Sequence, residues 1–147
     1  MEPVAGIRHV AILRSSHAHA RITSIDTSKA EALPGVHGVV TGVDIASVTN
    51  PIPSAIRVPI KFYPIAVDKV RYVGEPVAVI AAIDRYVAED AMELIEIEYE
   101  SLPPVADPVL ALEEGASLLH DDVGSNQVHH RTFKYGDPDA AFASADK

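Results

Sequence analysis

The clearest alternation of hydrophobic and polar positions lies in residues 77–101. A continuous apolar run, VAVIAAI at 77–83, has strand length and is typical of a strand buried on both faces. Asp84 suits a helix N-cap, and apolar residues then recur every three or four positions through 85–94. From Ile95 the period changes to two, which predicts a second strand with one packed face. The other face of that strand is acidic and solvated, with carboxylates at Glu96, Glu98 and Glu100.

Shorter patterns predict the elements on either side of this unit. Further strands are expected at 7–14, 21–25, 36–41, 65–73 and 127–134. Short helices are expected from a cap at Asp26 or Thr27 through Leu33, after Asp44 at 45–48, at 109–114 and at 139–145, the last anchored by Phe142. The first two strands would pair most simply as a hairpin, or continue as one bent strand. The sequence therefore predicts an α+β fold of mixed strands with flanking helices.

Length and composition limit the classes of function. The 147 residues suffice for one domain with a single core, expected to span 1–147. A formal net charge of −9 argues against nucleic acid and anionic membrane surfaces as partners, because both attract basic patches. The chain has no cysteine, which excludes disulfides and thiolate metal sites within it. No apolar run reaches the roughly 18–20 residues of a membrane span, so we expect a cytoplasmic protein.

The segment at 49–63 is the least regular part of the chain. Pro51, Pro53 and Pro59 interrupt a set of apolar residues that is too hydrophobic for a free linker. Two interpretations are open: the loop covers the core of its own domain, or it lies in an interface or funnel with another domain. Further along, Gly74 with Pro76 predicts a kink before the central strand, set by backbone geometry.

Candidate chemistry is sparse. His17 and His19 would share one face of a strand, but no third metal ligand lies near them in the sequence. No GxSxG, GxGxxG or phosphate-binding loop occurs. We therefore predict no catalytic residue, no metal site and no self-contained active site in this chain. A second cluster of oxygen and nitrogen ligands lacks a specific metal-binding spacing and comprises His120, Asp121, Asp122, His129 and His130.

Four segments together resemble a known family. They are HVAILRSSHAHARI at 9–22, VRYVGEPVAVIAA at 70–82, EIEYESLPPV at 96–105 and YGDPDAAFASAD at 135–146. In this order and at these distances they resemble the α/β hammerhead domain of the molybdenum hydroxylases. That family comprises xanthine dehydrogenase, aldehyde oxidase and the large subunit of carbon monoxide dehydrogenase. Ser16 and Pro138 depart from the family pattern, but both lie in predicted turns or caps.

The resemblance implies a hammerhead fold and a place within a larger oxidoreductase. The complete enzymes of that family hydroxylate an aldehyde or N-heterocycle at molybdopterin (Mo) and pass electrons to Fe–S centres and FAD. The cofactor-binding loops and the glutamate base of the family match nothing in this chain. We therefore expect it to bind no cofactor alone, and to be a truncated or separately encoded part of the catalytic subunit. Its expected partners are the molybdopterin-binding domains and the Fe–S and FAD subunits.

Within that resemblance the chain has a supporting role beside the cofactor domains, and it contributes to the wall of the substrate entrance. The candidates for the entrance, or for an interface, are Ile60, Lys61, Phe62 and Tyr63. The alternative is an independent small module with the same fold that binds a ligand or a protein.

Overall fold

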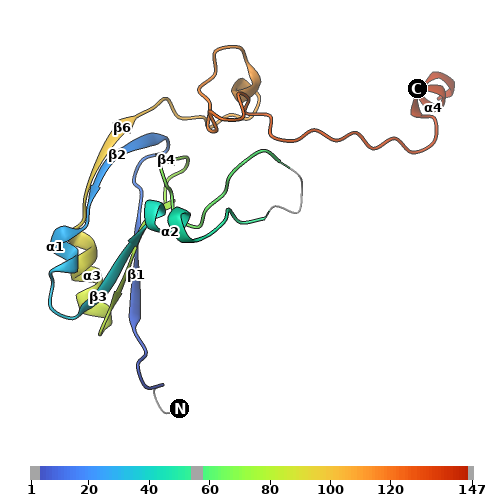
Figure 1. Cartoon of the computed structure of the whole chain (residues 1–147). Helices are drawn as coiled ribbons and strands as arrows, with labels where there is room; N and C mark the ends of the chain where they lie inside the picture. Colours follow the sequence, from blue (N-terminus) through green and yellow to red (C-terminus); the bar gives the residue numbers. More distant parts are fainter. Residues whose placement is uncertain (1–3, 54–57, 146–147) are drawn as a thin grey trace.

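Two three-stranded antiparallel sheets and four α-helices make up the part of the chain that this computed structural model describes, residues 4–53 and 58–145 (Figure 1). The predicted α+β class is confirmed, and residues 54–57 of the predicted loop lie outside the described residues. In chain order the elements are β1 (His9–Arg14), β2 (Ala20–Asp26), α1 (Ser28–Glu31), β3 (Val36–Thr41), α2 (Gly42–Val48), β4 (Lys69–Val70), β5 (Pro76–Ala82), α3 (Arg85–Glu93), β6 (Glu96–Ser101), the 3₁₀ helix η1 (Leu110–Leu112) and α4 (Pro138–Ser144).

The apolar run predicted as a buried strand forms β5, the central strand of the first sheet. The order of this sheet is β1-β5-β3. Ala78, Ile80 and Ala82 on one face of β5 are buried completely, and Ala78 and Ile80 belong to the largest apolar cluster. With a strand on each edge, β5 bonds its backbone N–H and C=O groups on both sides. The predicted burial on both faces is only partly observed among the described residues, because Val79 and Ala81 on the other face are half-buried.

The second sheet has the order β4-β2-β6 and follows the alternating pattern of 95–101. Ile22 lies opposite Tyr99, and Ile25 lies opposite Ile97, on the face that packs against the apolar clusters. The other face of β6 carries the three predicted glutamates, and all three are exposed. The prediction of one packed and one acidic face is therefore confirmed.

The predicted hairpin between the first two strands is wrong, because β1 and β2 belong to different sheets. After β1, two backbone hydrogen bonds hold Ser15 to the turn before β5. The Ser15 N–H donates to the Glu75 carbonyl at 2.9 Å, and the Gly74 N–H donates to the Ser15 carbonyl at 2.8 Å. β2 then begins at Ala20 and pairs with β4 and β6 instead. β1 therefore pairs with the apolar strand β5, and β2 pairs in the sheet that has one packed and one polar face.

α1 and α3 cover the core face of the first sheet. The Asp84 carboxylate accepts the Val87 N–H at 2.9 Å, so the predicted N-cap of α3 is confirmed. Ala88 and Ala91 are the buried residues of α3, and their small side chains let the helix approach the sheet closely. Figure 1 shows α1 and α3 grouped on one side of the three strands.

α2 begins three residues earlier than the sequence predicts. Thr41 is its N-cap, and the Asp44 carboxylate accepts the Thr41 N–H at 2.8 Å in a capping box. Asp44 therefore lies at the third helical position and not at the cap. Gly42 was a poor signal for a helix, but a Cβ there would lie 2.0 Å from the Ala66 carbonyl oxygen. Glycine at this position allows the segment before β4 to pack against α2.

Two predicted strands are shortened or missing. Of the predicted strand 65–73 only Lys69 and Val70 form β4, because only Ala20 and Arg21 of β2 lie opposite them. Residues 127–134, all of which the structure describes, form no strand. Figure 1 shows this segment leading away from both sheets. The side chains of this segment alternate in character as those of a strand do, but a strand also needs a neighbouring strand to complete its backbone hydrogen bonds.

The two C-terminal helices have the predicted caps but not the predicted packing. Asp107 accepts the N–H groups of Val109 and Leu110, yet only the 3₁₀ turn η1 forms in place of a helix at 109–114. Asp137 caps α4 by accepting the Ala140 N–H at 3.1 Å. The prediction that Phe142 anchors this helix is wrong, because its side chain is 84% exposed and α4 lies apart from the sheets (Figure 1).

Candidate functional site

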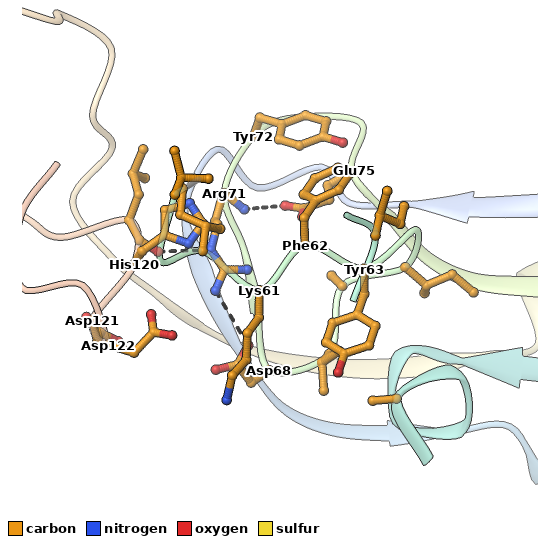
Figure 2. A pocket seen from close by; sticks show the side chains of 18 of the residues that line it. Lys61, Phe62, Tyr63, Asp68, Arg71, Tyr72, Glu75, His120, Asp121 and Asp122 are labelled. Carbon is orange, nitrogen blue, oxygen red and sulfur yellow. Dashed lines mark hydrogen bonds and ion pairs between the residues drawn. The ribbon is translucent and has the colours of Figure 1, made fainter. Parts of the chain in front are cut away.

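A cavity of about 830 Å³ lies between the segment before β5 and the loop at 119–122 (Figure 2). All four residues predicted for the entrance or interface contribute to its wall, namely Ile60, Lys61, Phe62 and Tyr63. Tyr72 adds a third aromatic side chain, so the wall combines apolar and aromatic groups with a few charged ones. A volume and lining of this kind are typical of small-molecule sites in proteins.

The described part of the proline-rich loop forms one wall of the cavity. The Ile52 N–H donates to the Phe62 carbonyl at 2.7 Å, which joins the two arms of the loop. Ile65 and Ala66, where the loop ends, are buried in the domain, whereas Phe62 is 51% exposed. The loop thus packs on its own domain at its end and presents an aromatic ring to the cavity. Whether that ring meets a substrate or a neighbouring domain stays a prediction.

A tight turn at 72–75 forms another part of the wall. Gly74 has φ of +90°, and the Glu75 N–H donates to the Tyr72 carbonyl at 3.3 Å. Arg14 of β1 donates from Nη1 to the Gly74 carbonyl at 2.8 Å and fixes the turn from outside. The predicted kink at Gly74 is confirmed, and its cause is backbone geometry: residues other than glycine rarely adopt this φ.

Glu75 is the buried acid of the cavity. Its carboxylate accepts the backbone N–H of Arg71, and its side chain is almost fully removed from solvent. Burial raises the pKa of the Glu75 carboxyl above its usual range, and the hydrogen bond and positive charge of Arg71 oppose this only in part. A carboxyl group of this kind can exchange a proton with a ligand nearer to neutral pH than an exposed glutamate can.

The opposite wall is tied to the second sheet by two cations. Lys69 of β4 is buried and donates from Nζ to Asp121 at 2.7 Å and to the Leu118 carbonyl at 3.3 Å. Arg71 donates from Nε to the Leu119 carbonyl at 2.9 Å. The Lys69 ammonium holds the pKa of Asp121 below its usual range, and Arg21 adds a second ion pair at 3.3 Å. These contacts hold the loop at 118–122 against the second sheet, although this loop comes after all six strands in the chain.

The histidines of the sequence do not converge. The His19 ring is buried, with Nδ1 2.8 Å from the Pro103 carbonyl, and the His17 ring packs 4.5 Å from the Tyr99 ring. His120 lines the cavity, and burial together with the nearby Arg71 and Lys69 charges lowers its pKa below the usual range. Among residues 4–53 and 58–145, no group of three or more His, Asp or Glu side chains could hold a metal ion.

Sequence reasoning missed three parts of this site: Arg71, Glu75 and the pair formed by Lys69 and Asp121. Glu75 stood inside the quoted GEP segment, but nothing in the pattern showed that its side chain is buried. Lys69 and Asp121 are 52 residues apart in the chain, and no periodicity relates them. Only the folded chain brings them together.

Comparisons with known proteins place this fold in a family. Residues 2–103 match the family described as aldehyde oxidase and xanthine dehydrogenase, a/b hammerhead domain. The carbon monoxide dehydrogenase large chain of Afipia carboxidovorans is 42% identical over 147 residues, which cover 91% of this chain and 18% of the relative. The nicotinate dehydrogenase large molybdopterin subunit of Eubacterium barkeri is 39% identical over 139 residues, covering 94% of this chain and 31% of the relative.

Solved structures agree with this assignment. The structure of a Cu,Mo-CO dehydrogenase in its carbon monoxide reduced state superposes with a TM-score of 0.79 at 38% identity, covering 99% of this chain and 20% of that one. The chain therefore belongs to the aldehyde oxidase and xanthine dehydrogenase family, and its residues 2–103 match the α/β hammerhead domain of that family. It spans about a fifth of the length of the carbon monoxide dehydrogenase chains that it matches.

The cavity does not fit a molybdopterin cofactor, which carries a phosphate. Among the described residues that line it, four carry a carboxylate, Asp68, Glu75, Asp121 and Asp122, and two carry a cationic group, Lys61 and Arg71. Arg71 already donates to two backbone carbonyls and pairs with Asp68 at 3.6 Å. Such a site repels a phosphate group, and we derive no chemical step from that cofactor in this chain.

No helix in the described ranges is long and apolar enough to cross a membrane.

Proposed function

We propose that this chain is the hammerhead domain in the large subunit of a molybdopterin-dependent hydroxylase or dehydrogenase. The enzyme would oxidise an aldehyde, an N-heterocycle or a similar small molecule, and the chain would be inactive alone. The family match and the relative named as a large molybdopterin subunit support this proposal. A cytoplasmic location stays a prediction.

Within that enzyme, we propose that the cavity wall formed by Ile60, Lys61, Phe62 and Tyr63 borders the path of the substrate. The observation that carries this proposal is the aromatic lining that Phe62, Tyr63 and Tyr72 give to a cavity of about 830 Å³. Such a wall can bind a planar or apolar molecule by contact and exclude water from it, while the chemical step occurs elsewhere.

The test uses the complete enzyme with Phe62→Ala and, as a matched control, Tyr86→Ala. Tyr86 lies on α3 and is 77% exposed. Initial rates would be measured with nicotinate and with benzaldehyde as probe substrates, together with the molybdenum content of each variant. We expect Phe62→Ala to raise KM about 3- to 10-fold with a smaller change in kcat, because it removes contact area without touching the reacting atoms.

Two outcomes would contradict the entrance role. An unchanged KM at full molybdenum content would show that substrate does not pass this wall. Loss of molybdenum or of partner subunits from Phe62→Ala alone would instead assign the wall to an interface between domains.

The partners proposed for the chain are the molybdopterin-binding part of the same subunit and subunits carrying Fe–S centres and FAD. The names of the relatives support an assembly of several subunits, since one is a large chain and the other a large subunit. Affinity capture with this chain as bait, followed by assays for molybdenum, iron and flavin, tests this. Recovery of the chain without any of the three would count against the proposal.

An independent ligand-binding module is the second candidate. The observation that favours it is that the described residues of this one chain line the cavity, including the buried Glu75. Calorimetric titration of the 147-residue chain with nicotinate and with benzaldehyde distinguishes the two functions. Saturable binding without any partner would favour the module, and its absence would favour the subunit.

A further inference from the structure

The pairing register of the first sheet assigns its residues to two faces. In antiparallel pairs, residues directly opposite each other project to the same side. Val10 lies opposite Ala81, Ile12 lies opposite Val79, and Val79 lies opposite Val40 on the other edge. Together with Gly38 opposite Ala81, these positions form what we call the outer face of the first sheet: Val10, Ile12, Gly38, Val40, Val79 and Ala81.

The opposite face of the same sheet is the one that α1 and α3 cover. Ala78 and Ile80 on that face pack in a cluster with Ala30 of α1 and Ala91 of α3. Figure 1 shows both helices on that side of the strands. The outer face receives no comparable cover from the described residues: Val10 remains 60% exposed and Ile12 remains 41% exposed.

The composition of the outer face is unusual for a surface in contact with water. None of its six residues has a polar side chain. A one-sided antiparallel sheet normally alternates apolar inward residues with polar outward ones. Contiguous apolar side chains across three strands are instead typical of a surface that another layer of protein covers.

The geometry points to one occupant: an apolar helix from the remaining part of the same large subunit packs on the outer face of the first sheet. This inference rests on the proposed function, that the chain is one domain of a larger subunit. About four-fifths of the carbon monoxide dehydrogenase chains that it matches lie outside the matched region. Glycine and alanine near the centre of the face allow the close approach that a helix on a sheet requires.

A helix fits better than a single added strand or a second copy of the chain. A strand would add to an edge of the sheet through backbone hydrogen bonds, whereas the apolar surface here is a face. A second copy of the chain would bring another formal charge of −9 close to the first, which opposes association at low salt. The partner surface is therefore uncharged and apolar where it meets this sheet.

The test exploits the absence of cysteine from the 147 residues. Ile12→Cys and, separately, Tyr86→Cys are introduced into the complete enzyme, and the alkylation of each peptide by iodoacetamide is followed by mass spectrometry. Tyr86 is the control because it is 77% exposed on α3, the helix on the other side of the sheet. We expect Cys introduced at position 12 to react at least about tenfold more slowly than Cys at position 86, with equal rates in urea.

A thiol-reactive benzophenone attached at position 12 identifies the occupant. Cross-links to a helix elsewhere in the large subunit support the inference. Equal alkylation rates at positions 12 and 86 in the native enzyme would overturn it, as would cross-links only to a second copy or to another subunit. If Ile12→Cys fails to assemble, Val10→Cys on the same face carries the test. Because the readout is labelling and not KM, failure here is distinguishable from failure of the entrance role.

Discussion

The two sheets of this domain expose opposite kinds of outer face. The outer face of the first sheet is apolar, whereas the outer face of the second carries cross-strand pairs such as Arg21 with Glu100 and Asp26 with Glu96. Both sheets pack their other face against the shared apolar clusters. The outer face of the second sheet is therefore suited to contact with water, whereas the outer face of the first is suited to contact with another layer of protein.

The largest expected effect separates the two faces of the first sheet. Ile80→Ala should lower the free energy of unfolding by about 2–5 kcal/mol, because the fully buried side chain leaves a cavity in the main cluster. Ile12→Ala, on the outer face, should cost about 1 kcal/mol or less in the 147-residue chain, where its side chain stays partly exposed. Urea denaturation followed by circular dichroism measures both. Equal losses would show that the outer face is covered within this chain.

The next effect tests the junction between the sheets. Gly42→Ala should cost at least about 2 kcal/mol, because its Cβ would meet the backbone of Ala66 and Val67 and displace the segment before β4. Gly38→Ala is the matched control, since nothing lies within 4 Å of a Cβ there, and it should be neutral or stabilise by up to about 1 kcal/mol. Thermal unfolding of both variants checks this. A tolerated Gly42→Ala would mean that this segment does not pack against α2.

A smaller effect concerns the charged side of the second sheet. Asp121→Asn should cost about 1–3 kcal/mol, because Lys69 stays buried without its carboxylate. Asp122→Asn, whose side chain has no recorded ion pair among the described residues, is the control and should be nearly neutral. Hydrogen exchange of the 118–122 amides measures the effect locally. Unchanged exchange rates in Asp121→Asn would show that this ion pair does not hold the loop against the sheet.

The acid stability of this contact has a defined sign. The folded-state pKa of Asp121 is depressed, so its stabilisation is present above the usual value of 3.8 and is lost as pH falls through the lower folded value. In Asp121→Asn, this loss of folding stability at low pH should be absent when stability is measured as a function of pH.

The smallest expected effect is a gain in thermal stability from a substitution at Glu75. Because the pKa of Glu75 is raised in the folded state, the folded protein binds this proton more tightly than the unfolded chain. Stability from this group is therefore greatest below its usual value of 4.5 and falls as pH rises through the raised value. Glu75→Gln keeps an acceptor for the Arg71 N–H and should slightly raise the melting temperature at pH 7, with no gain below pH 4. A lower melting temperature at pH 7 would show that the charge itself is needed, and Glu98→Gln on the exposed face controls for net charge.

Much of the local structure could be predicted from the chain alone. The run at 77–83, the cap at Asp84 and the alternation after Ile95 each appear as β5, α3 and β6 within a residue or two. These signals are strong because each depends on neighbours in the sequence: a carboxylate three residues from an N–H, or side chains on one face of one element. The loop at 60–63 could also be identified as a candidate site, because apolar residues interrupted by prolines are recognisable from composition alone.

Partnerships between distant segments could not be predicted in this way. The sequence by itself determined the type of each strong element, the acidic face of β6 and the family resemblance. Only the tertiary structure decided that β1 pairs with β5 and not with β2, that 127–134 forms no strand, and that Lys69 holds Asp121 across 52 residues. The physical reason is that periodicity sets which face of an element is apolar, whereas the choice of neighbour depends on how all such faces are buried together.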